Sequence, residues 1–279
     1  MPKGNEKEDG SAGGAKAACG APGGAVVCRG VSRDYGGKRV LDGVDLRVEA
    51  GTVTAVVGPM GAGKTTLLKM LAGIVPPTAG RIEVAGFDMR TDGREARRRI
   101  GYVPAEERSF FWRLTGRQNL DFFGGLHGLR AAEKKRRIEA ALRRLGLADQ
   151  ADAAFRNYSS GMKQALSLAR GLLHEPAVLL LDEPGRSLSV EIAARVHGII
   201  REWAEKRGAA VVLASHDVGD VKRTADRLLI LKRGRVEAEG PIGEVRRAIE
   251  ARTQRDGGEA GSALDEWDEA FRERMRGGA

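Results

Sequence analysis

The feature that most constrains this 279-residue chain is the string GPMGAGKT at residues 58–65, which fits the pattern G-x-x-x-x-G-K-[ST] in full. Its glycines let the backbone curl so that successive N–H groups point at a phosphate, and a helix starting at the lysine adds partial positive charge. In this pattern the Lys64 ammonium reaches the β- and γ-phosphates of a nucleotide and the Thr65 hydroxyl ligates Mg²⁺. The predicted phosphate-binding residues are Gly58, Pro59, Met60, Gly61, Ala62, Gly63, Lys64, Thr65 and Thr66.

The sequence around this motif predicts an α/β fold. A β-branched run at 52–57 precedes the motif, and a helix is expected over 64–71. Further strands are predicted at 81–84, 178–181 and 209–214, helices at 94–99, 119–126, 131–145 and 191–206, and a hairpin around Arg233-Gly234. Strands that alternate with helices indicate a largely parallel sheet, and the helical block at about 91–170 is expected to form an inserted subdomain.

The chain divides into three predicted parts. Residues 1–24 are rich in Gly and Ala and nearly free of large apolar side chains, so we expect a disordered extension. Residues 25–240 form the main domain. Residues 241–279 form a C-terminal helical extension, in which a helix over 263–275 is expected to dock on the same chain through one apolar face. That face comprises Leu264, Trp267, Phe271 and Met275.

Composition excludes several classes of protein. The sequence has no uncharged apolar run of about 18 residues and no apolar stretch near the N-terminus, so neither a membrane span nor a secretory signal is expected. Two cysteines are too few for a disulfide scaffold, which favours a reducing compartment. The net charge of +9 first suggests a nucleic-acid or membrane partner.

A second chemical feature is the pair Asp182-Glu183, which ends the apolar run 178–181. A buried strand that delivers a carboxylate to the carboxyl edge of a parallel sheet places it at the ligand crevice. We expect Asp182 to hold the Mg²⁺ shell and Glu183 to polarise the water that attacks the γ-phosphate.

With these motifs in place, the sequence resembles the nucleotide-binding subunit of ATP-binding cassette (ABC) transporters over about residues 25–240. The most specific part is YSSGMKQ at 158–164, which resembles the ABC signature about 20 residues before Asp182. By the same resemblance, Tyr35 matches the aromatic residue that stacks on adenine, and His216 matches the switch histidine that contacts the γ-phosphate. The implied fold is a P-loop NTPase (RecA-like) core with an N-terminal antiparallel β-subdomain and an inserted α-helical subdomain.

The resemblance also implies a mechanism. Two such domains pair head to tail, as a homodimer or heterodimer, with ATP and Mg²⁺ between the phosphate loop of one and the signature residues Ser159, Ser160 and Gly161 of the other. Hydrolysis of ATP to ADP and phosphate releases the pair, and an integral membrane permease converts this alternation to transport. The expected location is peripheral, on the cytoplasmic face of the cell membrane.

Two positions depart from the family pattern. The glutamine that the family carries after the strand at 100–103 is missing, and the matching position is Ala105 or Glu106, depending on where one gap is placed. We favour Glu106, whose carboxylate would still reach the metal shell. The family's aspartate in the loop after Glu183 is replaced by Ser189 in Ser187-Leu188-Ser189, which predicts weaker coupling between the two sites of the pair.

The stretch 107–120 and the 264–275 segment resemble ABC-2 type exporters, which favours export over import. The stretch 107–120 contains three adjacent aromatic residues that cannot all face one core, namely Phe110, Phe111 and Trp112. They either bury partly in the helical subdomain or form a patch that receives a helix of the permease.

Two alternatives remain: a non-transport ABC ATPase associated with nucleic acid or ribosomes, and a regulatory subunit with low turnover. Against the first, residues 90–99 and 130–144 carry net charges of +3 and +5, which account for most of the excess. Both segments lie in the predicted helical subdomain, which faces the membrane partner in the family. The charge therefore fits an anionic membrane surface, and no nucleic-acid partner is expected.

Overall fold

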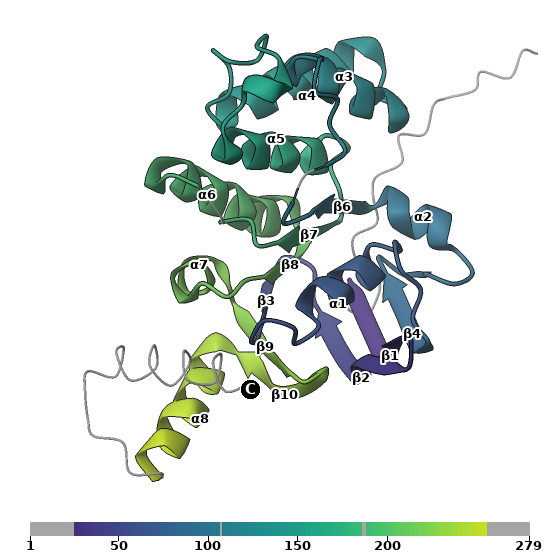
Figure 1. Cartoon of the computed structure of the whole chain (residues 1–279), viewed down its shortest axis with the longest axis vertical. Coiled ribbons are helices and arrows are strands. Elements are labelled where there is room, and N and C mark those ends of the chain that lie inside the picture. Colours follow the sequence, from purple (N-terminus) through teal and green to yellow (C-terminus); the bar gives the residue numbers. More distant parts are fainter. Residues whose placement is uncertain (1–24, 107, 186–187, 256–279) are drawn as a thin grey trace, which may run out of the picture.

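The computed structural model describes residues 25–106, 108–185 and 188–255. Within these residues the chain forms two sheets and the helices that pack against them (Figure 1). The predicted extension at 1–24, the predicted helix at 263–275, and residues 107 and 187 lie outside the described residues.

The smaller sheet is antiparallel, as the family resemblance implies. Its strand order is β2-β1-β4-β5. The strands are β1 (Val26–Tyr35), β2 (Lys38–Val48), β4 (Ala79–Val84) and β5 (Phe87–Asp88). Gly36 and Gly37, with φ of 53° and 84°, close the hairpin in which Tyr35 pairs with Lys38.

The larger sheet has the order β10-β9-β3-β8-β7-β6 and is parallel except for β10. Its strands are β3 (Val53–Val57), β6 (Ile100–Val103), β7 (Val178–Asp182), β8 (Ala210–Ala214), β9 (Arg227–Lys232) and β10 (Arg235–Pro241). Strands β3, β7 and β8 are buried along their whole length, which explains their continuous apolar sequences. The predicted hairpin joins β9 to β10 at Arg233-Gly234, so that prediction is confirmed.

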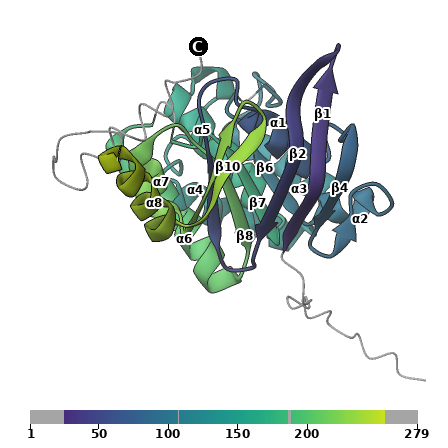
Figure 2. The same ribbon diagram turned by 90° about the horizontal axis from the view of Figure 1, so that it is seen from below.

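Helices cover both faces of the larger sheet (Figures 1 and 2). Helix α1 (Lys64–Leu71) packs between the two sheets, and α2 (Gly93–Arg98) precedes β6. The other helices are α3 (Gly116–Leu126), α4 (Ala131–Arg144), α5 (Ser160–Leu172), α6 (Val190–Arg207), α7 (Val218–Thr224) and α8 (Ile242–Arg255), with a 3₁₀ turn at Phe155–Asn157. In the described ranges, no helix is both long and apolar enough to cross a bilayer.

The helical insertion starts later than the sequence indicates. Strand β6 falls inside the range 91–170 but pairs with β7 in the larger sheet. Thr115 then begins α3 with a capping box, in which its hydroxyl accepts from Gln118 N and the Gln118 side chain accepts from Thr115 N. We therefore place the start of the insertion after β6.

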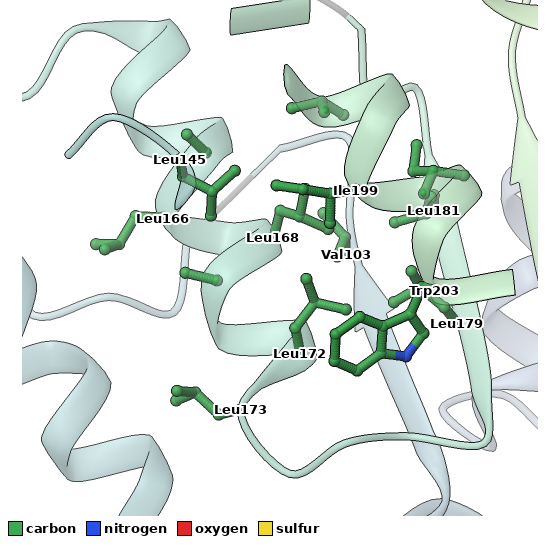
Figure 3. Close-up of a cluster of buried hydrophobic side chains, with 14 of the residues drawn as sticks. Val103, Leu145, Leu166, Leu168, Leu172, Leu173, Leu179, Leu181, Ile199 and Trp203 are labelled. Atoms are coloured by element: carbon green, nitrogen blue, oxygen red, sulfur yellow. The ribbon is translucent and has the colours of Figure 1, made fainter. Parts of the chain in front are cut away.

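The helical insertion and the sheet share one apolar core (Figure 3). Leu179 and Leu181 of β7 point toward α5 and α6, where Leu172 and Trp203 pack, while Leu180 points toward α1 on the opposite face. This alternation follows from the two-residue period of a strand. Trp203 is anchored because its indole nitrogen donates to the carbonyl oxygen of Pro176 at 3.2 Å.

A stacked pair of histidines lies at the junction between the insertion and the sheet. The rings of His127, after α3, and His174, after α5, are 3.9 Å apart between centroids and 2° from parallel. His174 Nε2 lies 3.0 Å from the carbonyl oxygen of Ile100 in β6. Burial, reinforced by charge repulsion from His127, lowers the pKa of His174 to about 4.

This depressed pKa predicts a loss of stability in acid. Since an unfolded histidine titrates near 6.5, the unfolded chain binds a proton at His174 before the folded chain does. Between pH 7 and pH 5 the free energy of unfolding should fall by about 2 kcal/mol through this residue. In His174→Gln, denaturant unfolding at both pH values should show that much less pH dependence. An equal pH dependence in variant and parent would contradict the assignment.

Candidate functional site

The phosphate loop follows β3 and leads into α1, as the motif predicts. Gly61 and Gly63 have φ of 79° and 107°, a left-handed range that residues with a side chain rarely adopt. Gly58 is needed for a different reason, because a Cβ there would lie 2.1 Å from the carbonyl oxygen of Leu231 in β9. The loop thus passes directly against a neighbouring strand.

The lysine of the motif is held against the loop itself. Lys64 Nζ donates to the carbonyl oxygens of Gly58 at 2.7 Å and Pro59 at 3.2 Å. Burial lowers the pKa of Lys64, and the negative charges of Glu183 and Asp182 oppose that shift. The ammonium therefore lies where the loop and the two carboxylates meet.

The hydroxyl of the motif meets the first carboxylate. Thr65 Oγ1 donates to Asp182 Oδ1 at 3.2 Å, across from α1 to the end of β7. Asp182 is 1% exposed, and its burial raises the pKa of the carboxyl, while the hydrogen bond from Thr65 lowers it. A hydroxyl and a buried carboxylate this close are the oxygen ligands that Mg²⁺ prefers.

The second carboxylate is set beside a histidine. Glu183 has φ of 52°, a left-handed conformation that is costly for a residue with a side chain, and its N–H donates to the carbonyl oxygen of Ala214 at the end of β8. His216 Nδ1 lies 2.8 Å from Glu183 Oε2, and the imidazole is 66% exposed. Sequence reasoning named both residues separately, and the structure joins them.

An open cleft of about 630 Å³ runs along the loop, a size suited to a nucleotide. Predicted residues in its lining are Met60, Gly61, Ala62, Gly63, Lys64, Thr65, Thr66 and Glu183. Tyr35 does not line the cleft, but it pairs across the β1–β2 hairpin with Lys38, and Lys38 does line the cleft. Tyr35 is 42% exposed, and the guanidinium carbon of Arg33 lies 4.4 Å from the centroid of its ring.

The signature residues lie apart from this cleft. Ser159 caps α5, because its hydroxyl accepts from Met162 N at 3.2 Å, and Ser160 and Gly161 form the first turn. Ser159 and Ser160 are exposed, and none of the three lines the cleft. Helix α5 belongs to the helical layer, across β6 and β7 from α1 (Figure 1).

The two departures from the family pattern have separate structural settings. Glu106 is exposed and its carboxylate pairs with Arg108 at 2.6 Å, with no contact described to Thr65 or Asp182. Ser189 is the N-cap of α6, and its hydroxyl accepts from Ile192 N at 3.5 Å. Because serine and aspartate are both good N-caps, this substitution keeps the local role while removing a charge.

Two sets of residues near the site escaped sequence reasoning. Asp220, at the start of α7, places its Oδ1 atom 2.8 Å from His197 Nε2. Its carboxylate also lies against the loop after Glu183, because a Cβ added to Gly185 would be 2.0 Å from Asp220 Oδ2. Lys38 and Arg233 bring further positive charge to the cleft. No local motif marks these contacts, because they join residues from separate elements.

Known proteins resemble this chain over most of its length. The ABC transporter family profile matches residues 41–186. The daunorubicin resistance ATP-binding protein DrrA3 of Streptomyces coeruleorubidus is 41% identical over 222 residues, which cover 80% of this chain and 70% of that protein. The Nod factor export ATP-binding protein I of Burkholderia lata is 36% identical, over 76% of this chain and 69% of that protein. A solved structure of an ATP binding subunit of an ABC transporter is 28% identical, with a TM-score of 0.78 over 89% of this chain and 99% of that one.

The close approach of the loop to β9 can be tested by one methyl group. Gly58→Ala should lower the free energy of unfolding by about 2 kcal/mol, because the new Cβ forces the loop away from Leu231. Gly198→Ala is the control, since Gly198 lies in α6 with open space around its Cα, and alanine there should stabilise by about 0.5–1 kcal/mol. Denaturant unfolding of both variants checks the prediction, and a Gly58→Ala protein as stable as the parent would contradict it.

Proposed function

This chain belongs to the ABC transporter family, whose cassettes bind and hydrolyse ATP, and we propose that it dimerises around ATP to power export through a membrane permease. The observation that most strongly supports hydrolysis at this cleft is the meeting of four predicted residues at one sheet edge. They are Thr65, Asp182, Glu183 and His216.

We assign phosphate binding to the loop and α1. Backbone N–H groups of the loop and of the first turn of α1, together with the Lys64 ammonium, bind the β- and γ-phosphates. Thr65 and Asp182, which already share a hydrogen bond, fit a site for Mg²⁺. Mg²⁺, when bound, neutralises charge on these phosphates. Glu106 remains a proposed metal-shell residue, although it pairs with Arg108 in this structure.

Glu183 is the proposed general base. Its carboxylate, 16% exposed, lies in the cleft lining and takes a proton from the water that attacks the γ-phosphate. His216 holds Glu183 through the contact between Nδ1 and Oε2, and its exposed ring is free to contact the γ-phosphate. The left-handed backbone of Glu183 is consistent with a residue held in place for chemistry.

The separation of signature and cleft supports a site shared by two chains. Ser159 and Ser160 expose a hydroxyl-capped helix N-terminus, whereas Gly161 is buried behind them, and none of the three lines the cleft of the same chain. In a head-to-tail pair this N-terminus faces the γ-phosphate bound by the other chain, where its N–H groups favour negative charge. Tyr35 then stacks on the adenine at the nucleoside end of the cleft.

Export is proposed from the relatives and from the sequence of the helical insertion. One relative is named for daunorubicin resistance and another for Nod factor export. Phe111 and Trp112 are 45% and 73% exposed, and Phe111 packs edge-on against Phe122 of α3, itself 42% exposed. These three side chains form an apolar surface suited to a permease helix. Phe110, in contrast, is buried.

The proposed location is peripheral, on the cytoplasmic face of the membrane. Helix α4 carries exposed basic side chains at Lys135, Arg136 and Arg143. Basic residues near an anionic leaflet each contribute about 1 kcal/mol to membrane binding. This surface supports a membrane-facing insertion, and no nucleic-acid partner is proposed.

Replacing the base should stop chemistry while sparing binding. Glu183→Gln should lower the rate of ATP hydrolysis about 10²–10⁴-fold, because the amide cannot accept the proton of the attacking water. It should also accumulate an ATP-bound dimer in light scattering. Glu244→Gln, an exposed change in α8, is the control and should keep the parental rate. Hydrolysis by Glu183→Gln at the parental rate would rule out Glu183 as the base.

The permease contact is tested at the most exposed aromatic residue. Trp112→Ala should reduce, by about tenfold or more, the membrane protein that co-purifies with the chain from detergent-solubilised membranes. Ile74→Ala, which removes an exposed apolar side chain after α1, should leave co-purification unchanged. Mass spectrometry of the two preparations makes the measurement. Equal recovery with both variants would contradict the assignment of this surface.

A further inference from the structure

We propose that Arg233, in the turn between β9 and β10, binds the nucleotide phosphate nearest the nucleoside, the α-phosphate, and so sets the affinity for ATP and ADP. This inference rests on the proposed nucleotide cleft. It adds to that cleft a nucleotide-binding residue that lies far from the motif in sequence.

The first observation is the backbone conformation of the turn. Arg233 and Gly234 have φ of 49° and 78°, and Lys232 pairs with Arg235 across them. Two left-handed central residues define a type I′ turn, which favours asparagine or glycine at its first position. An arginine at the first central position of this turn adopts an unfavourable backbone conformation. Such strained residues occur often where the side chain has a functional role.

The turn is also fixed to the phosphate loop. Gly234 N donates to the carbonyl oxygen of Ala62 in the loop at 3.2 Å, and Asp42 N donates to the carbonyl oxygen of Gly234 at 2.9 Å. A Cβ on Gly234 would lie 2.4 Å from the carbonyl oxygen of Val40, so the turn packs tightly between loop and β2. The Arg233 side chain, exposed and part of the cleft lining, therefore starts from a rigid base beside the phosphates.

Sheet order indicates which phosphate lies within reach. Strand β9 neighbours β3 on one side, while β7, which carries Asp182 and Glu183, is two strands away from β3 on the other. At about 4.8 Å per strand, the ends of β9 and β7 are about 14 Å apart. Arg233 thus flanks the loop on the side opposite the proposed base. The β1–β2 hairpin lies on the same side of the loop as Arg233. In this hairpin Lys38 lines the cleft and Tyr35 pairs with Lys38.

Charge pairing leaves this arginine available. Asp42, whose backbone N–H donates to Gly234 in this turn, accepts from both Arg39 and Arg235, so its carboxylate already pairs with two guanidinium groups. In the described part of the chain, Arg233 and Lys38 have no ion pair. A guanidinium presents two parallel N–H groups that match two oxygens of a phosphate. The ligand chemistry that fits this position is the phosphate adjoining a nucleoside.

Such a contact affects binding more than chemistry. The α-phosphate is present in both ATP and ADP and does not change its bonds when the γ-phosphate is transferred to water. A contact with it stabilises ground state and transition state equally, which lowers KM without raising kcat. Loss of the Arg233 side chain should therefore lower the affinity for ATP and the affinity for ADP by the same factor.

Arg233→Asn is the decisive variant, since asparagine suits the type I′ turn better than arginine. In calorimetric titration of the full chain, it should bind ADP about 5–20-fold more weakly than the parent, as expected for loss of a partly exposed charged hydrogen bond. The KM for ATP should rise by a similar factor while kcat is kept. Its melting temperature without nucleotide should equal or exceed that of the parent. Arg233→Lys, which keeps the charge but not the fork, should fall between the two in affinity.

Arg235→Asn is the matched control, because Arg235 is next in the hairpin but pairs with Asp42 instead of lining the cleft. It should bind ADP as the parent does. Parental ADP affinity in Arg233→Asn, or an equal loss in Arg235→Asn, would overturn the inference, as would a fall in kcat without a rise in KM. A parent chain that fails to bind ADP and ATP would instead contradict the proposed function itself.

Discussion

The cleft depends on how closely three backbones approach one another. The phosphate loop touches β9 at Gly58, and the β9–β10 turn touches β2 at Gly234. At both places the nearest atom to an added Cβ is a carbonyl oxygen of the main chain, at 2.1 Å and 2.4 Å, so no side chain could move aside to make room. These two contacts fasten the smaller sheet to the larger one at the point where the loop curls. The positions of Lys64 and Thr65 follow from them, because α1 begins where the loop ends.

The chemistry at the other side of the loop depends on burial. Strand β7 is enclosed on both faces, and it carries Asp182 to the sheet edge with almost no exposed surface. The next residue, Glu183, turns into a left-handed conformation and emerges beside His216. The end of β7 therefore supplies two different carboxylates: the buried one of Asp182, which suits a metal ligand, and the partly exposed one of Glu183, which suits a general base. These two roles need different surroundings.

Much of this could be predicted from the sequence, because the phosphate loop, the apolar strands and the Asp182-Glu183 pair are local patterns. The N-terminal sheet, the parallel sheet and the hairpin at Arg233-Gly234 all formed as predicted. The strand at 100–103 was recognised in the sequence, but only its pairing with β7 shows that it belongs to the larger sheet and that the helical insertion starts after it. Lys38, Arg233 and the contact between Asp220 and His197 were missed, because only tertiary packing brings them to the site. Ser189 shows the opposite limit: the substitution was evident in sequence, whereas its capping of α6 required the structure.

We propose that each chain holds only half of a complete hydrolytic site, since the signature residues do not line the cleft of their own chain. The most direct measurement is the rate of ATP hydrolysis per chain over a wide range of chain concentration, with light scattering on the same samples. The rate per chain should rise with concentration as dimers form and should then level off. A constant rate per chain in samples that light scattering shows to be monomeric would contradict this proposal.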